Sequence, residues 1–183
     1  MTKQDYINLF NMMHPGFFEQ EHIKNISDTA VAEEMMLPLN EFNPMLYDRK
    51  PDGNVSFGYF SGDYDKLKHD VYRVADDWVD YFKEDEKIYC AFINGEVVSF
   101  CIVDDMGEYT LNGKKIKIGG PGCVGTLPEY RNRGIGLNMI KNVTEIFRDE
   151  GFDYSYIHYT GVSRWYAKLG YKTVLKWNGK GIL

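Results

Sequence analysis

The sequence predicts an α+β fold in which a mixed central β-sheet is flanked by α-helices. Three observations support this expectation. Alternating apolar patterns typical of strands recur from residue 54 onward, two of them are joined by an Asn-Gly turn, and a long amphipathic helix separates two later strands. A hairpin pairs its strands antiparallel, whereas a helical crossover joins parallel strands, so both kinds of pairing are expected.

Composition restricts the classes of protein to consider. The chain has 183 residues, one domain's worth, and 44% of them are apolar. Its formal net charge of −6 argues against a nucleic-acid binder, which would carry a basic face. The sequence has no apolar run long enough to cross a membrane and its start has no signal pattern, so we expect a cytoplasmic protein without membrane contact.

Residues 1–50 predict a helical N-terminal extension. "KQDYINLFNMM" (3–13) has helical spacing, and "SDTAVAEEMMLPL" (27–39) starts with a capping residue and stops near Pro38. The stretch 40–54 is rich in proline, aspartate and glycine, which is typical of a boundary. The expected division is therefore an extension over 1–50 and a main domain over 54–183.

The main domain is expected to begin with a strand, a helix and a hairpin. "NVSFGYF" alternates like a strand, "DYDKLKHDVYRVADDWVDYF" is amphipathic, and Asn94-Gly95 joins "KIYCAFI" to "EVVSFCIVDD". A hydrophilic connection follows, with a second turn at Asn112-Gly113. The later elements are a glycine-rich strand, a long helix, a strand, a short helix and a last strand: 116–127, 135–150, 152–160, 163–169 and 171–177.

The long helix has one apolar stripe and starts with two glycines. The stripe consists of Ile135, Met139, Ile140, Val143, Ile146 and Phe147. The residues expected to face water are Asn138, Lys141, Asn142, Glu145 and Arg148. Gly151 follows the helix as a typical end signal.

Gly134 and Gly136 fall in the first turn of this helix, where backbone N–H groups have no intrahelical partner. Removing two side chains there lets a ligand approach the amides, and the helix dipole favours an anion. Arg131 and Arg133 add positive charge beside it. The alternative is a tight turn whose glycines only permit close packing.

Two other phosphate-binding motifs are excluded. "GPGCVGT" (120–126) has the glycines of a nucleoside-triphosphate loop, but Thr126 follows Gly125 where that loop needs a lysine. The dinucleotide pattern GxGxxG would need a third glycine at Met139. Neither nucleotide-binding class fits this sequence.

The arrangement that fits is a strand, then Arg131-x-x-Gly134-x-Gly136, then a helix. Here the sequence resembles the GNAT family of acetyl-CoA-dependent N-acetyltransferases, whose pattern [RQ]-x-x-G-x-[GA] is met by "RNRGIG". Downstream, "RWYAKLGY" (164–171) is similar to the family's "FYEKLGF". The resemblance covers Asn54 to Trp177, so the GNAT fold is the fold that it implies.

The resemblance implies a binding site for acetyl-CoA. The turn that would hold its pyrophosphate comprises Arg131, Asn132, Arg133, Gly134, Ile135, Gly136 and Leu137. Val124, Gly125 and Thr126 would pair with the pantetheine arm, in a gap where the neighbouring strands splay apart. The Val124 amide would polarise the thioester carbonyl. Thr126 replaces the aliphatic residue that the family has there.

The resemblance also implies a general acid. Tyr166 matches the tyrosine that protonates the departing thiolate, and its alternative role is packing on the sheet, which Trp165 could also fill. The family's usual strand glutamate is missing, and its asparagine seven residues before the tyrosine is Tyr159 here.

Several groups compete for the role of general base. His158 has a suitable unperturbed pKa, but a lone strand histidine is more often a core residue. The acidic residues after the hairpin (Asp104, Asp105 and Glu108) could face a cationic amine, or form a solvated turn. A water chain without a single base is another alternative. Cys123 invites an acyl-cysteine route, although direct attack by the amine is the family norm.

We therefore expect an enzyme that transfers an acetyl group from acetyl-CoA to a primary amine of a small molecule or a peptide, by direct attack. The alternative is a catalytically silent acyl-CoA-binding regulatory module on the same fold. A third hypothesis is that residues 1–50 dock a partner, for example in a homodimer. No metal site is expected, since Cys90, Cys101 and Cys123 show no ligand spacing.

Overall fold

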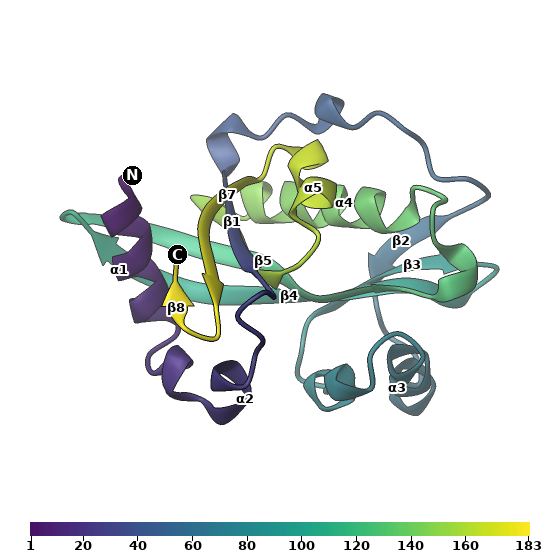
Figure 1. Cartoon of the computed structure of the whole chain (residues 1–183). Helices are drawn as coiled ribbons and strands as arrows, with labels where there is room; N and C mark the ends of the chain where they lie inside the picture. The colour runs from purple at the N-terminus through teal and green to yellow at the C-terminus, as the bar shows by residue number, and fades with distance from the viewer.

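The computed structural model describes all residues, 1–183, and places eight strands in one sheet of order β2-β3-β4-β5-β6-β1-β7-β8 (Figure 1). The strands are β1 (Ala32–Pro38), β2 (Ser56–Tyr59), β3 (Ile88–Ile93), β4 (Glu96–Leu111), β5 (Lys114–Thr126), β6 (Tyr154–Thr160), β7 (Lys172–Asn178) and β8 (Gly181–Ile182). Only β5 and β6 pair in parallel. The predicted mixed sheet is confirmed.

Helices cover both faces of the sheet (Figure 1). The α-helices are α1 (Lys3–Met13), α2 (Glu21–Lys24), α3 (Tyr64–Tyr72), α4 (Ile135–Asp149) and α5 (Ser163–Tyr166). Short 3₁₀ turns are η1 (Phe17–Glu19), η2 (Leu39–Glu41), η3 (Pro44–Leu46), η4 (Asp76–Tyr81), η5 (Pro128–Tyr130) and η6 (Ala167–Leu169). α4 and α5 lie on one face, and α2 and α3 on the other. No helix is both long enough and apolar enough to cross a membrane.

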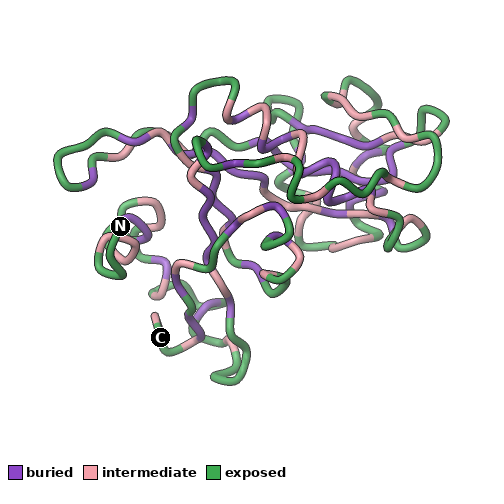
Figure 2. Tube along the Cα trace, turned by 90° about the horizontal axis from the view of Figure 1, so that it is seen from above, coloured by how far each residue is buried: buried purple, intermediate pink, exposed green.

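The core is divided by the sheet. Met139, Ile140 and Val143 of α4 pack against Met35 and Ile157 on one face. On the other face α3 packs against β3 and β4, and α1 packs against the far end of the sheet. Buried segments run through the middle of the fold and exposed ones lie along the outer loops (Figure 2), because helices cover both faces of the sheet.

The prediction of a helix over residues 27–39 is wrong, because residues 32–38 form strand β1 between β6 and β7. Met35 packs on the α4 side and Met36 on the opposite side, so the strand is buried on both faces. Such a strand has a continuous apolar sequence, which periodicity alone cannot distinguish from a helix. Ser27, taken for a helix cap, instead bonds to the Thr29 amide at 3.3 Å.

Residues 1–50 are therefore not a purely helical extension. α1 forms where predicted, with Thr2 and Asp5 as a capping box, but β1 belongs to the same sheet as the strands of the predicted 54–183 domain. The start of α1 also lies near the last residue of the sequence, since Lys3 Nζ donates to the Leu183 carbonyl at 2.7 Å.

Both predicted Asn-Gly turns are confirmed: Asn94, Gly95, Asn112 and Gly113 all have positive φ. The prediction of a hydrophilic connection after the first hairpin is wrong, because β4 continues to Leu111. Asp104 and Asp105 therefore lie inside a strand, opposite Gly120 and Gly119. Asp105 and Glu108 form ion pairs with Lys117 and Lys115, at 3.7 and 3.6 Å, so these carboxylates are surface charges of the strand.

Candidate active site

The sheet opens between β5 and β6. Parallel pairing is limited to Ile118 with Tyr154 and Gly119 with Ser155, and β5 then continues to Thr126 without a partner on that side. A Cβ on Gly120 would lie 2.0 Å from the Tyr156 carbonyl oxygen, so the strands still touch at this point and part beyond it. The predicted gap is present.

A β-bulge lies on the β5 side of the opening. The β4–β5 register shifts between Phe100 and Ile102, opposite Cys123, whose φ of 46° is left-handed. A bulge re-aims the backbone of the strand that carries it. The bulge that the glycine-rich sequence predicts therefore lies directly before Val124.

The first turn of α4 presents bare amides next to this opening. Gly134 precedes the helix with φ 74°, and no side chain caps the first turn. A Cβ on Gly136 would lie 2.8 Å from Thr126 Oγ1 and 3.3 Å from the Trp165 ring. Glycine at this position thus lets the end of β5 and α5 close around the helix start.

A cleft of about 480 Å³ lies between these elements. It contains Tyr166 and all the predicted cofactor residues except Arg133, whose side chain lies over the Tyr130 ring at 5.2 Å. The cleft residues that were not predicted are Tyr47, Arg49, Val74, Tyr130, Val162, Trp165 and Lys168. A smaller hollow of about 390 Å³ beside α3 holds none of the predicted residues.

The charge of the cleft fits an anion. Its lining includes Arg49, Arg131 and Lys168 but no carboxylate, although the whole chain is acidic. Arg131 Nε donates to the Thr126 carbonyl at 3.1 Å, which ties the loop to the end of β5. Cations and unpaired helix amides together suit a diphosphate, so the residues present fit acetyl-CoA.

Thr126 is accommodated by a hydrogen bond. Its hydroxyl lies 2.8 Å from Ser99 Oγ, which also donates to the Gly125 carbonyl at 2.6 Å. Ser99 is fully buried. The pair satisfies a polar side chain at a position where the resemblance implies an aliphatic one.

Tyr166 lies in the cleft wall and is 6% exposed. Its ring packs edge-on against Trp165, with centroids 4.8 Å apart, and against Tyr171 at 6.0 Å. Burial raises the pKa of the Tyr166 phenol above its ordinary value. The hydroxyl therefore keeps its proton at neutral pH, as a general acid must.

His158 is not among the residues that line this cleft. Its Nδ1 lies 3.0 Å from a carboxylate oxygen of Glu34, and its ring stacks on His14 with centroids 4.0 Å apart. Phe17 packs edge-on against it at 5.2 Å. β5 and β6 run parallel, and Ser155 pairs with Gly119. Three residues further along each strand, His158 therefore lies across the opening from Gly122, which is two residues before Val124.

Two other residues lie on the face away from α4. Cys123 packs against the α3 cluster, and burial together with Asp77 raises the pKa of its thiol to about 11. Such a thiol is protonated and a poor nucleophile near neutral pH, which removes support from the acyl-cysteine route. Tyr159, at the position of the family's asparagine, packs on Trp177 at 4.6 Å.

Comparison with known sequences identifies the family. The profile of the Acetyltransferase (GNAT) domain matches residues 57–174, well over half of the chain. The chain belongs to the GNAT family. The predicted GNAT fold is confirmed, and the matched range of this GNAT domain includes β5, α4 and α5, which form most of the cleft.

Relatives of this GNAT domain are distant. The uncharacterized N-acetyltransferase CT2212 of Chlorobaculum tepidum is 25% identical over 134 residues, covering 73% of this chain and 76% of its own length. A glucosamine N-acetyltransferase region of a fungal multi-domain β-N-acetylglucosaminidase superposes with a TM-score of 0.65 at 20% identity, covering 81% of this chain and 20% of the fungal one. A GCN5-related N-acetyltransferase of Kribbella flavida superposes with a TM-score of 0.56 at 15% identity, covering 88% of this chain and 62% of the Kribbella chain.

These solved structures show the fold, and this chain spans only part of their length. The matched family range starts at residue 57. Glu34, Tyr47 and Arg49 precede it, and nothing in their local sequence indicated a site. Only the folded chain brings them to the opening.

Proposed function

We propose that this GNAT domain transfers the acetyl group of acetyl-CoA to a primary amine of a small molecule or a peptide. The observation that supports the proposal is the cleft in which the bare first turn of α4, the free end of β5 and Tyr166 meet. In this reading Asn132 to Leu137 hold the diphosphate with backbone N–H groups, and Arg131 adds charge.

Acetyl-CoA would supply a thioester carbonyl as the electrophile. The Val124 amide would donate a hydrogen bond to its oxygen and stabilise the negative charge that develops there. The amine nitrogen forms a bond to the carbonyl carbon while the carbon–sulfur bond breaks. Tyr166 gives its proton to the departing sulfur, and a base takes the proton that the amine loses.

We assign the base to His158. Glu34 accepts a hydrogen bond at Nδ1, so the neutral ring keeps its lone pair on Nε2. This nitrogen is on the side of the ring away from β1. The side chain is 27% exposed, on the face opposite α4. An amine that approaches the opening from this face could hand its proton to His158.

The first experiment is a calorimetric titration with acetyl-CoA, followed by an assay of thiol release with a panel of amines. The panel contains polyamines, amino acids, peptides with free N-termini, and amino sugars, because the fungal relative is described as a glucosamine N-acetyltransferase. Donor binding and amine-dependent thiol release are expected. Binding without release from any amine would favour the silent acyl-CoA-binding module instead.

Gly136→Val tests the location of the site. The added side chain would project between Thr126 and Trp165, which are walls of the cleft. Loss of acetyl-CoA binding in a variant with unchanged circular dichroism is expected. Gly58→Val is the control, because Gly58 of β2, like Gly136, has no positive φ, but it has open space around it and does not line the cleft. Unchanged affinity in Gly136→Val would move the donor site elsewhere.

A further inference from the structure

The chain between β1 and β2, residues 39–55, passes over the same face of the sheet as α4 and α5 (Figure 1). We call this segment the strap. It begins beside β6, where the Leu39 amide donates to the Asp153 carbonyl at 2.9 Å. It then buries Phe42 in the α4 core and ends at β2. The whole strap precedes the range that the GNAT profile matches, 57–174.

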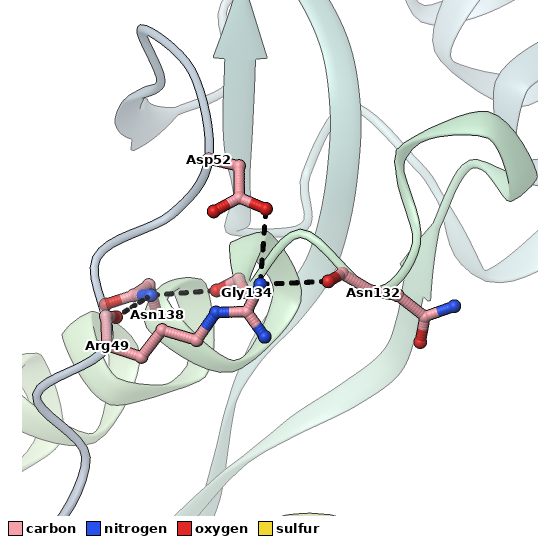
Figure 3. A network of polar contacts seen from close by, with 5 residues as sticks. All are labelled: Arg49, Asp52, Asn132, Gly134 and Asn138. Carbon is pink, nitrogen blue, oxygen red and sulfur yellow. Dashed lines mark hydrogen bonds and ion pairs between the residues drawn. The ribbon is translucent and has the colours of Figure 1, made fainter.

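Polar contacts fix the strap to the start of α4 (Figure 3). Asn138 Nδ2 donates to the Arg49 carbonyl at 2.9 Å and to the Gly134 carbonyl at 2.8 Å. The Asp52 amide donates to the Arg133 carbonyl at 2.8 Å. Asn138 was expected to face water and is instead only 6% exposed. The expectation is wrong because the strap covers this side of the helix.

The Arg49 side chain reaches the phosphate loop itself. Its Nη2 donates to the Asn132 carbonyl at 3.0 Å and pairs with Asp52 at 3.2 Å. Its Nε lies 3.4 Å from the place where a Cβ on Gly134 would be, and the Tyr47 hydroxyl lies 3.2 Å from the same point. Both side chains line the cleft.

Asp52 is the one carboxylate paired with Arg49, and the cleft that Arg49 lines otherwise carries only positive charge. The N-terminus of α4 carries partial positive charge, and Arg131 stands on the same loop. The hydrogen bonds of the Arg49 guanidinium within the chain come from Nη2 alone. The N–H groups of its Nε and Nη1 have no acceptor within the chain, so they remain as charged donors for phosphate oxygens.

We propose that Arg49, supported by the Tyr47 hydroxyl, is a diphosphate ligand of the acetyl donor, supplied by the strap. This inference rests on the proposed function, since it assumes that acetyl-CoA occupies the cleft. The strap then does more than connect two strands: it completes the donor site from outside the matched GNAT range.

The test measures acetyl-CoA affinity by calorimetry in the full chain. Arg49→Ala is expected to raise Kd about ten- to hundredfold, the usual size for a charged hydrogen bond, and Arg49→Lys less. Tyr47→Phe should give a smaller rise. Arg148→Ala is the control, because Arg148 is a half-exposed cation in the last turn of the same helix. It should leave Kd unchanged.

A second arm uses the 3′-dephospho form of acetyl-CoA. An equal loss for both donors in Arg49→Ala supports contact with the diphosphate. A loss confined to acetyl-CoA itself would overturn that assignment in favour of the 3′-phosphate. Unchanged affinity in both Arg49 variants would overturn the inference and leave the proposed function standing. Absence of donor binding in the unmodified protein would overturn both.

Folding is checked separately. The strap is anchored through the Arg49 carbonyl and the Asp52 amide, which the Arg49 variants keep. Thermal unfolding should therefore be little changed. Should Arg49→Ala unfold at a lower temperature, Arg49→Lys, which keeps the charge and the aliphatic stem, decides the question by its affinity alone.

Discussion

Glu34 Oε2 and His158 Nδ1 lie 3.0 Å apart, although 124 residues separate them in the chain. The Glu34 carboxylate is fully buried and also accepts from Trp177 Nε1 at 2.6 Å and from the Tyr159 amide at 3.3 Å. A carboxylate only accepts hydrogen bonds, so Nδ1 must be the protonated nitrogen of His158. Trp177 and the Tyr159 amide hold the Glu34 carboxylate in place, and the carboxylate in turn orients the imidazole. A general base needs such a fixed orientation.

His158→Gln is therefore expected to lower kcat by about a hundred- to ten-thousand-fold, the range for general acid–base steps, and to leave the Kd of acetyl-CoA unchanged. Glu34→Gln should lower kcat less, since it removes the charge and keeps the shape. In the His158→Gln background the Glu34 change should have no further effect on kcat. Additive losses would show that Glu34 affects turnover independently of His158, and full activity of His158→Gln would leave the base to a water chain.

Tyr166→Phe keeps the ring in the cleft wall and removes only the acidic proton. We expect turnover to fall by about a hundred- to ten-thousand-fold, with little change in acetyl-CoA affinity by calorimetry. Tyr171→Phe is the matched control, because its hydroxyl lies between Ser155 and Thr144, at 2.7 and 2.9 Å. That variant should lose about 1–3 kcal/mol of stability and keep its turnover. Equal turnover in both variants would reduce Tyr166 to a packing residue.

Local patterns predicted the parts of the fold that local contacts determine. The two Asn-Gly turns, α4 and the glycine start of that helix depend on neighbours within a few residues, and each forms where the sequence indicated. The opening between β5 and β6 was implied by the family resemblance. Most of the cleft residues from β5 and from the start of α4 could therefore be predicted from the sequence.

The remaining features depend on distant segments. β1 looked helical because both of its faces are buried, and burial on two faces leaves no alternation to detect. Asn138 looked exposed because the strap that covers it lies about ninety positions earlier in the chain. Glu34 and Arg49 carried no signal, since each makes these contacts with a partner on a distant element.

His14 makes folding depend on pH. Burial in the aromatic cluster, and then His158, lower the pKa of His14 from 6.5 to about 4, while Glu34 opposes the shift. The unfolded chain therefore binds a proton near pH 6.5 that the folded chain does not accept until about pH 4. The stability that the neutral His14 contributes is complete above pH 6.5 and is lost as the pH falls toward about 4.

His14→Phe should weaken this pH dependence. Phenylalanine keeps an aromatic ring over His158 and removes the buried Nε2, which has no hydrogen-bond partner. Urea midpoints measured from about pH 7 to about pH 4 should fall less steeply in the variant than in the unmodified protein. His22→Phe is the control, since His22 is exposed. Parallel curves for His14→Phe and the unmodified protein would assign the acid sensitivity to other groups.

A Cys123 variant tests whether the acetyl group is first transferred to the Cys123 thiol. This thiol lies at the bulge before Val124, and burial together with Asp77 raises its pKa to about 11, so roughly a thousandth is thiolate at pH about 8. Direct attack by the amine needs no thiolate. Cys123→Ala should therefore keep its turnover, and intact-mass spectra of the protein with acetyl-CoA alone should show no acetyl adduct. An adduct that is absent from Cys123→Ala, together with lost turnover in that variant, would establish an acyl-cysteine route instead.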